Sequence, residues 1–285
     1  MAGGDADPNL YSLLEHLKRA RVAHVPLLAG AAAHPVLTWD LDRDALELDG
    51  RPLAPRAVFI RHDVFTNMAD GRDASTHRAY AWFTTILSWA AAHRDVRLFN
   101  RNHVAFVLKP QQLLVAREQG LAIPSTLVTN DAARLESLQD ERVVKPVAGG
   151  EYTMPLAGTL KEAARRGDAL ASPAIVQSRL VPPELRIYRV GDELISFHVE
   201  STALDYRTDR KARVVHVRTD KRLAEPLRRT MDALNLDFGA ADFKKCPETG
   251  RMLFLEVNSG PMFAAFDAVS DGAVSRAIAR WLKGR

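Results

Sequence analysis

The sequence has little of what marks several classes of protein. Its 285 residues include one cysteine, Cys246, which excludes an internal disulfide framework and a zinc site built on cysteines. No apolar run reaches the roughly 18 residues that a membrane span needs. Residues 1–25 carry acidic side chains early and lack the long apolar stretch of a secretion signal. These absences favour a cytoplasmic protein without a membrane partner.

The chain as a whole carries only a mild excess of positive charge. The net charge is +4 at neutral pH, and charged residues make up 26% of the sequence, an ordinary share for a globular protein. Because Lys and Arg are spread out, nucleic acid is a weaker candidate partner than an anionic small ligand. With 47% hydrophobic residues, the chain can bury a core of one to three subdomains.

Helix and strand patterns change in character along the chain. Apolar spacing predicts helices within residues 9–20 and 76–94, with short strands near 58–60 and 96–100, which together predict a small α/β unit over residues 1–105. After residue 105, helical segments mix with antiparallel hairpins, and an amphipathic helix closes the chain. This second pattern predicts α+β packing rather than a doubly wound parallel sheet.

The segment RMLFLEVNSGPMF has two polar side chains within an apolar strand pattern. Because side chains alternate along a strand, Glu256 and Asn258 share a face with Met252 and Phe254. The hairpin returns Asp242 of the preceding strand to a position opposite Glu256. Two carboxylates and an amide suit Mg²⁺, and apolar neighbours on that face imply burial, where a carboxylate needs a partner or a metal. From this pattern alone, a metal site and an ordinary solvated face are equally good explanations.

Two lysines could supply positive charge for a polyphosphate. Lys145 ends an apolar strand shortly before Gly149 and Gly150, and paired glycines let the backbone approach an anion closely. Lys109 follows an apolar segment and directly precedes a helical pattern. Taken alone, Lys145 is better explained as the residue before an ordinary turn, and Lys109 is equally ambiguous. The residues gain weight together because all of them would serve one polyphosphate.

The order of these elements resembles the ATP-grasp superfamily. Lys109 precedes PQQLLVAREQGLAIPSTLVT, Lys145 lies in VVKPVAGG, and IVQSRL, ELRIYRVGDEL, Asp242 and LEVNSGP follow. The chain is most similar to RimK-type glutamate ligases and microviridin-type peptide maturases, over residues 95–285. The resemblance implies an α+β ATP-grasp fold with an N-terminal α/β domain, a central subdomain and a C-terminal subdomain that holds the metal site: residues 1–105, 106–180 and 181–285.

The resemblance also implies how a nucleotide is bound. Lys109 and Lys145 match the two lysines that reach the phosphates, and the turn at Gly149 and Gly150 matches the mobile loop that closes over them. Glu184 matches an acidic position that contacts the ribose. The hinge segment that reads adenine corresponds to Gln177, Ser178, Arg179 and Leu180.

The residues expected to act on the reacting groups follow from the same resemblance. Arg186 matches an arginine that points at the active site. Arg207, in a DYR element similar to the maturases' Asp-Trp-Arg, matches a residue that stabilises the phosphorylated intermediate. The implied metal ligands are Asp242, Glu256 and Asn258. The implied cofactors are ATP and two Mg²⁺ ions, with Mn²⁺ as a substitute.

The resemblance implies an ADP-forming ligase that activates a carboxylate of an amino acid or peptide as an acyl phosphate. An amine, or a hydroxyl in some maturases, then displaces phosphate. The alternatives are a maturase that crosslinks a ribosomal precursor peptide through amides or esters, a kinase that stops at phosphoryl transfer, and a non-catalytic nucleotide-binding regulator. The tail SGPMF is closer to the RimK pattern than to the maturases. Similar ligases also suggest a homo-oligomer.

Overall fold

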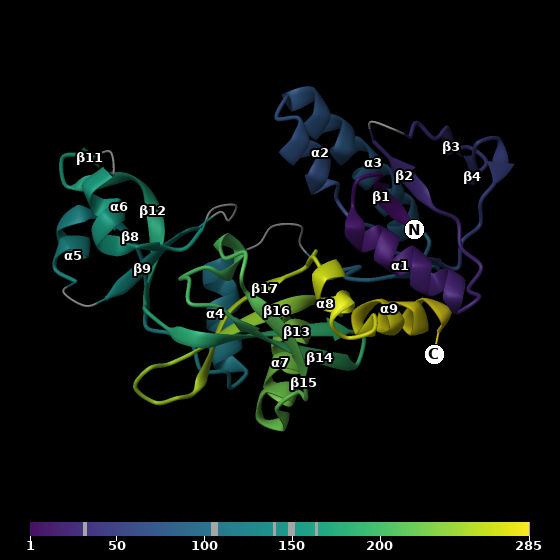
Figure 1. Ribbon diagram of the computed structural model, residues 1–285. Helices are drawn as coiled ribbons and strands as arrows, with labels where there is room; N and C mark the ends of the chain where they lie inside the picture. Colours follow the sequence, from purple (N-terminus) through teal and green to yellow (C-terminus); the bar gives the residue numbers. More distant parts are fainter. Residues whose placement is uncertain (31–32, 104–107, 139–140, 148–151, 163–164, 285) are drawn as a thin grey trace. The chain divides into compact units, whose positions relative to one another are not determined.

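The chain is described here by a computed structural model (Figure 1), which covers residues 1–30, 33–103, 108–138, 141–147, 152–162 and 165–284. It divides into two compact units: residues 1–101 with 260–285, and residues 102–259. Residues 260–285 thus group with the N-terminal region, whereas the sequence placed them in a C-terminal subdomain. None of the helices in the covered stretches is long and apolar enough to cross a membrane.

The first unit combines short parallel strand pairs, a small meander and helices. β1 pairs with β2 and β6 with β7 in parallel, and β3, β4 and β5 form an antiparallel sheet. The helices predicted within residues 9–20 and 76–94 are α1 and α3. The bounds are β1 Ala2–Gly4, α1 Pro8–Arg19, β2 Leu27–Ala29, β3 Leu37–Asp40, β4 Ala45–Leu48, β5 Arg51–Pro52, β6 Ala57–Val58, α2 Val64–Ala69, α3 Asp73–Ala92, β7 Arg97–Leu98, α8 Ala264–Ala268 and α9 Ala273–Lys283.

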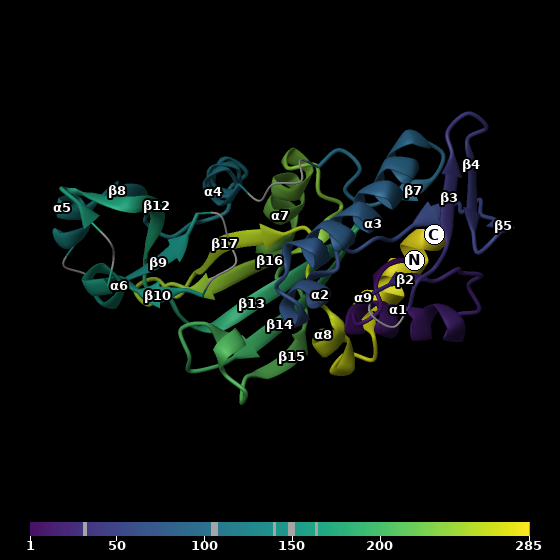
Figure 2. The same ribbon diagram turned by 90° about the horizontal axis from the view of Figure 1, so that it is seen from above.

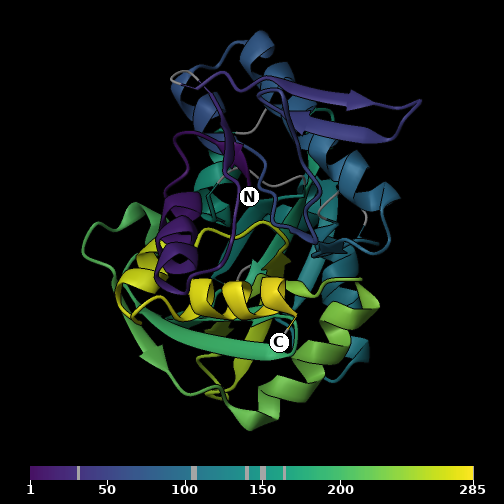
Figure 3. The same cartoon turned by 90° about the vertical axis from the view of Figure 1, so that its right-hand side faces the viewer.

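The C-terminal helix joins this unit through an apolar face. Val274, Ala277 and Ile278 of α9 are fully buried, and α9 lies beside α1 (Figure 3). Leu10 and Leu13 of α1 are likewise fully buried. Burial of two apolar stripes against each other favours this pairing, which explains why the end of the chain packs with its beginning.

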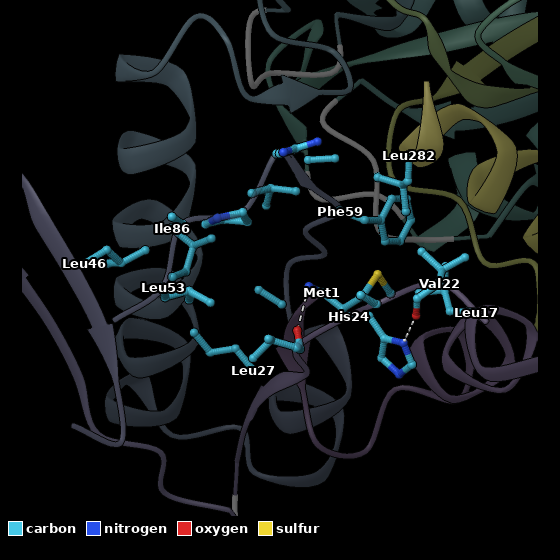
Figure 4. Close-up of a pocket in the computed structure, with 18 of the residues that line it drawn as sticks. Met1, Leu17, Val22, His24, Leu27, Leu46, Leu53, Phe59, Ile86 and Leu282 are labelled. Atoms are coloured by element: carbon cyan, nitrogen blue, oxygen red, sulfur yellow. Dashed lines mark hydrogen bonds between the residues drawn. The ribbon is translucent and has the colours of Figure 1, made fainter. Parts of the chain in front are cut away.

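A cavity of about 640 Å³ lies within the first unit (Figure 4). Its lining is largely apolar and includes Leu27 of β2, Leu46 of β4 and Ile86 of α3, together with Leu53 and Phe59, which directly follow β5 and β6. No local pattern in the sequence predicts this cavity, because its walls come from segments far apart in the chain.

The second unit contains two sheets. The first has the order β10–β9–β12–β11, with β8 also paired to β12, and the second has the antiparallel order β15–β14–β13–β16–β17 (Figure 2). This confirms the predicted α+β class. The bounds are α4 Lys109–Glu118, β8 Thr126–Asp131, α5 Ala132–Glu136, β9 Arg142–Pro146, β10 Met154–Pro155, α6 Leu156–Glu162, β11 Arg165–Arg166, β12 Ala169–Ser178, β13 Val181–Val190, β14 Glu193–Glu200, η1 Tyr206–Thr208, β15 Arg213–Val217, α7 Lys221–Ala233, β16 Phe238–Lys245 and β17 Met252–Asn258.

One face of the β13–β17 sheet packs against the helices of the second unit. Leu185 and Ile187 of β13 join a buried core with residues of α4 and α7, including Leu113 and Leu227. Because side chains alternate along a strand, the residues between them on β13 project to the opposite face. The core therefore fixes which side chains of β13, among them Glu184 and Arg186, lie on the other face.

Candidate nucleotide and metal site

The other face of the β13–β17 sheet, away from α4 and α7, carries charged side chains in register. Arg186 of β13 lies opposite Asp242 of β16, and Asp242 lies opposite Glu256 of β17. Glu184 lies opposite Lys244 on the same two inner strands. Directly opposed residues project to one side of a sheet, so these side chains form one charged face. The predicted pairing of Asp242 with Glu256 is confirmed.

The prediction that Glu256 shares a face with Met252 and Phe254 is wrong, because a β-bulge changes the alternation of side chains along β17. Asp242 pairs with Glu256, but Phe243 pairs with Phe254, which leaves Leu255 as an extra residue in β17. An extra residue moves the following side chains to the other face. Phe254 therefore lies in the core under the sheet, where its ring meets Phe243 edge to face with centroids 5.6 Å apart.

Burial of the two carboxylates has a different cause from the one inferred. Met252, also expected beside Glu256, packs against the same core as Phe254. Asp242 exposes only 6% of its surface and accepts two hydrogen bonds from Arg186, from Nε at 2.7 Å and Nη2 at 2.8 Å. This is a bidentate pair of the strong, charge-assisted kind. Cations, rather than Met252 and Phe254, lie against these carboxylates.

Glu256 is held by the lysine that begins α4. Nζ of Lys109 lies 3.1 Å from Oε2 of Glu256. Burial alone would raise the pKa of Glu256, but the charges of Lys109, Lys145 and Arg207 outweigh burial and lower the pKa below its usual value. Glu256 is therefore ionised at neutral pH, in the state that a cation ligand requires.

Glu184 is held by a residue that the sequence interpretation did not include in the site. Nζ of Lys244 lies 3.5 Å from Glu184 and donates to the carbonyl of Leu204 at 2.9 Å. Burial, and next the charge of Asp242, raise the pKa of Glu184 to about 7. The carboxylate is thus poorly solvated, and its ionised form gains from added positive charge nearby.

Lys145 enters the same cluster from the other sheet of this unit. It lies in β9 opposite Ile175 of β12. Burial lowers its pKa; the charge of Glu256 opposes this shift and the charge of Lys109 adds to it. A buried ammonium that has lost its water is stabilised by an anion, so Lys145 is suited to a phosphate.

The DYR element borders the charged face. Arg207 donates from Nε and Nη2 to Asp205, at 2.9 and 2.6 Å, and lies over the ring of Tyr152 at 5.0 Å. The ring of Tyr206 lies 5.8 Å from Cζ of Arg186, and burial raises the pKa of Tyr206 to about 12. The structure therefore brings Arg186 and the DYR element together, and their roles in the reaction stay predictions.

The predicted hinge segment joins the two sheets of the unit. Gln177, which is buried, donates to Oγ1 of Thr126 at 3.0 Å. Ser178 ends β12, Leu180 is buried, and the exposed Arg179 pairs with Glu141 at 3.0 Å. Contact with adenine stays a prediction for this segment. The predicted glycine turn, Gly149 and Gly150, lies outside the described residues.

The third predicted metal ligand lies at the end of β17. Asn258 is opposite Ala240, two residues before Asp242 on β16, so it shares a face with the two carboxylates. Among the described residues, no three His, Cys, Asp or Glu side chains are placed to hold a metal ion together. The candidate set has instead two carboxylates and an amide, which are ligands that suit Mg²⁺. Metal binding there stays a prediction.

The sequence interpretation missed the residue that fixes Lys109 beside β17. Gln112 of α4 donates to the carbonyl of Val257 at 3.0 Å and accepts from the amide of Val257 at 2.9 Å. Its side-chain amide therefore continues the sheet at the β17 edge, next to Glu256. A glutamine three residues into a helix gives no local signal of such a long-range pairing.

The two sheets, with a charged face between a lysine-bearing helix and a lysine-bearing strand, have the fold of the ATP-grasp ligases. PsnB, an ATP-grasp ligase solved with a phosphomimetic variant of its minimal precursor, Mg and ADP, has a TM-score of 0.78 and 23% identity to this chain, covering 99% of this chain and 96% of PsnB. No family model and no curated protein matches the sequence.

Two further solved structures are similar over nearly the whole chain. A RiPP-associated ATP-grasp ligase of Chryseobacterium gregarium, in complex with ADP and a leader and core peptide, has a TM-score of 0.72 and 18% identity, covering 99% of this chain and 95% of its own. The macrocyclase MdnC of Microcystis aeruginosa MRC, bound with precursor peptide MdnA, has a TM-score of 0.67 and 19% identity, covering 99% and 97%. The resemblance to the ATP-grasp superfamily is thus confirmed for the fold.

Proposed function

We propose that this chain is an ADP-forming ligase that uses ATP to activate a carboxylate of a peptide. The observation that carries the proposal is the charged face of the second unit, where Lys145 of the other sheet and Lys109 of α4 join the carboxylates of the β13–β17 sheet. On the described part of that face the cationic side chains outnumber the carboxylates by five to four: Lys109, Lys145, Arg186, Arg207 and Lys244 against Glu184, Asp205, Asp242 and Glu256.

The donor set fits a divalent cation and a polyphosphate. Asp242, Glu256 and Asn258 offer oxygen ligands on one face, and Mg²⁺ bound there would neutralise phosphate oxygens during phosphoryl transfer. Lys109 and Lys145 would bind the phosphates. Because Lys109 pairs with Glu256 in this structure, both side chains are close enough to share an anion and its counterion.

The chemistry then follows from where charge develops. An oxygen of the substrate carboxylate attacks the γ-phosphorus of ATP, the bond to the β-phosphate oxygen breaks, and ADP leaves. Arg186 and Arg207 would stabilise the acyl phosphate. An amine, or a hydroxyl where the product is an ester, attacks its carbonyl carbon, loses a proton and displaces phosphate. Positioning and charge neutralisation account for most of the catalysis in such transfers.

A peptide substrate is favoured over a free amino acid by the similar structures. PsnB, MdnC and the Chryseobacterium ligase are each described with a precursor, leader or core peptide. We therefore place this chain in peptide biosynthesis, with an amide or ester crosslink as the product. Its single cysteine fits a reducing cytoplasm, and a homo-oligomer stays a prediction.

A trapping experiment tests the reaction class. The protein is mixed with ATP, Mg²⁺ and peptides that contain several glutamates, with and without hydroxylamine, which converts an acyl phosphate into a stable hydroxamate. We expect ADP release that depends on the peptide, and a hydroxamate on the peptide. Release of ADP with a stable phosphorylated product and no hydroxamate would contradict the ligase and support a kinase, and absence of peptide-dependent ADP release would contradict both.

A further inference from the structure

The two edges of the β13–β17 sheet differ in their hydrogen-bond partners. At the β17 edge, Gln112 pairs with both backbone groups of Val257, and the amide of Phe254 donates to the carbonyl of Ala122 at 2.8 Å. At the other edge, β15 pairs with β14 alone in the part of the chain that the structure describes. Alternate residues of β15 therefore present backbone N–H and C=O groups to an incoming strand.

The open edge is surrounded by basic side chains. The stretch from residue 210 to residue 222 holds six exposed Lys and Arg residues, in the loop before β15, at both of its ends and at the start of α7: Arg210, Lys211, Arg213, Arg218, Lys221 and Arg222. Within the described stretches, only Arg222 of this group forms an ion pair, with Asp220 at 3.0 Å. Asp209 is engaged by the Oγ of Ser201 and the backbone amide of Lys211. Glu200 lies opposite Arg213. The edge therefore carries a strong surplus of positive charge.

Both faces of β15 carry part of this charge, and both offer apolar contacts. Phe197 of β14 lies opposite both Arg186 of β13 and His216 of β15, so His216 projects to the same face as Arg186. The ring centroids of Phe197 and His216 lie 5.1 Å apart. Val217 packs with the core on the opposite face. A strand added beside β15 would thus meet valines on the strand and cations at its ends.

We propose that β15 is a docking edge for an acidic peptide segment, which binds as an added antiparallel or parallel strand. Backbone hydrogen bonds to β15 would supply the register, and carboxylates of the peptide would pair with Lys211, Arg213 and Arg218. This is the known physical mode of strand addition, in which the main chain gives affinity and side chains give specificity. Charges on an edge strand also prevent aggregation, but a protective edge does not require one sign of charge at both ends. The proposal does not depend on the ligase activity.

Binding to labelled ten-residue peptides, followed by fluorescence anisotropy, tests this docking edge. An alternating Glu-Val peptide should bind, and its affinity should fall steeply with salt. An alternating Lys-Val peptide should bind at least tenfold more weakly. An acidic peptide of equal charge with every valine replaced by proline should also lose at least tenfold, because proline lacks the N–H that a ladder needs. Equal binding of the proline peptide would overturn strand addition.

Charge reversal at the edge gives the second arm. The triple variant Lys211→Glu/Arg213→Glu/Arg218→Glu should lower the affinity for the acidic peptide at least tenfold. The matched triple variant Lys18→Glu/Arg43→Glu/Arg51→Glu, at exposed positions of the first unit, should change this affinity less than twofold. Equal loss in both triples would overturn the site.

Hydrogen exchange on the unchanged chain locates the bound peptide without any substitution. Amides of residues 213–217 should gain protection when the acidic peptide is added. Absence of added protection there would overturn the assignment to β15. A single-stranded oligonucleotide that binds as tightly as the acidic peptide and displaces it would overturn the peptide in favour of nucleic acid.

Discussion

Each unit of the chain buries charge, but the two do so in different ways. In the first unit, Arg61 donates to Asp7 at 2.6 Å and to the carbonyl of Pro261 at 2.7 Å. The other oxygen of Asp7 accepts from Asn9, whose own side-chain oxygen accepts from the amide of Phe263 at 2.6 Å. In this network the polar groups satisfy one another, and they tie the start of α1 to the segment before α8.

The charged face of the second unit does not close in this way. Lys145 and Glu184 both have pKa values shifted by burial, toward their neutral forms. A charge pair that serves folding satisfies its own groups, whereas a ligand site keeps shifted groups that a ligand restores. The contrast teaches that burial alone does not identify a functional charge. A functional charge is identified by a pKa that burial has shifted toward the neutral form.

The largest effect expected on stability is in the closed network. Replacing Arg61 by Met leaves Asp7 buried without its cation, because the two side chains are only 4% and 0% exposed. We expect the free energy of unfolding to fall by about 3–5 kcal/mol, measured by urea denaturation. The matched change Arg43→Met, at a side chain that is 84% exposed, should stay within about 0.5 kcal/mol. A loss below about 1 kcal/mol for Arg61→Met would show that the Asp7–Arg61 network does not stabilise the fold.

In the second unit the expected loss is one of turnover rather than of stability. Glu256→Gln keeps the shape of the side chain but removes an anionic ligand, so peptide-dependent ADP release should fall about 100-fold or more. The control Glu248→Gln lies in the turn of the same hairpin, where the side chain is exposed, and should leave the rate within twofold. Full activity of Glu256→Gln would remove Glu256 from the metal site.

Lys145 allows a test in which stability and binding move in different directions. Burial opposes its charge, so Lys145→Met should not lower the melting temperature of the protein. Loss of the cation should nevertheless weaken ATP binding by about tenfold, measured by calorimetry. A variant that melts well below the parent would place Lys145 with Arg61 as a residue that stabilises the fold.

The smallest effect concerns an exposed pair in the first unit. The carbonyl of Trp89, and next Asp44, raise the pKa of His93 above its ordinary value of 6.5. Because the folded pKa is the higher one, this stabilisation is fully present below pH 6.5 and is lost as the pH rises through the raised value. His93→Gln should therefore reduce the fall in melting temperature between about pH 5 and pH 9. An unchanged fall would show that the contact contributes nothing measurable.

Local patterns predicted the register of the hairpin but not its irregularity. The short turn before β17 places Asp242 opposite Glu256 because a hairpin's register follows from its loop. The bulge at Leu255 has no such signal, since leucine fits a regular strand equally well. For that reason the side chain of Phe254 was assigned to the wrong face, although the residues proposed as metal ligands were assigned to the same one.

The partners of buried charges were even less accessible to sequence reasoning. Asp7 and Arg61 are 54 residues apart, and neither lies in a local sequence pattern that predicts the other as its partner. The same holds for Gln112, whose two hydrogen bonds join it to Val257 across 145 residues. Such pairs depend on how distant segments pack, and packing is not encoded in the spacing of nearby residues.

The sequence by itself determined the α+β class, the helices α1 and α3 and the shared face of Asp242, Glu256 and Asn258, because periodicity and hairpin return are local. Only the tertiary structure decided which cation holds each carboxylate and that Lys145 reaches them from the other sheet. The open β15 edge and the grouping of residues 260–285 with the N-terminal region were likewise decided there. These features arise when apolar faces from separate segments are buried together, and the charged groups take the positions that this burial leaves.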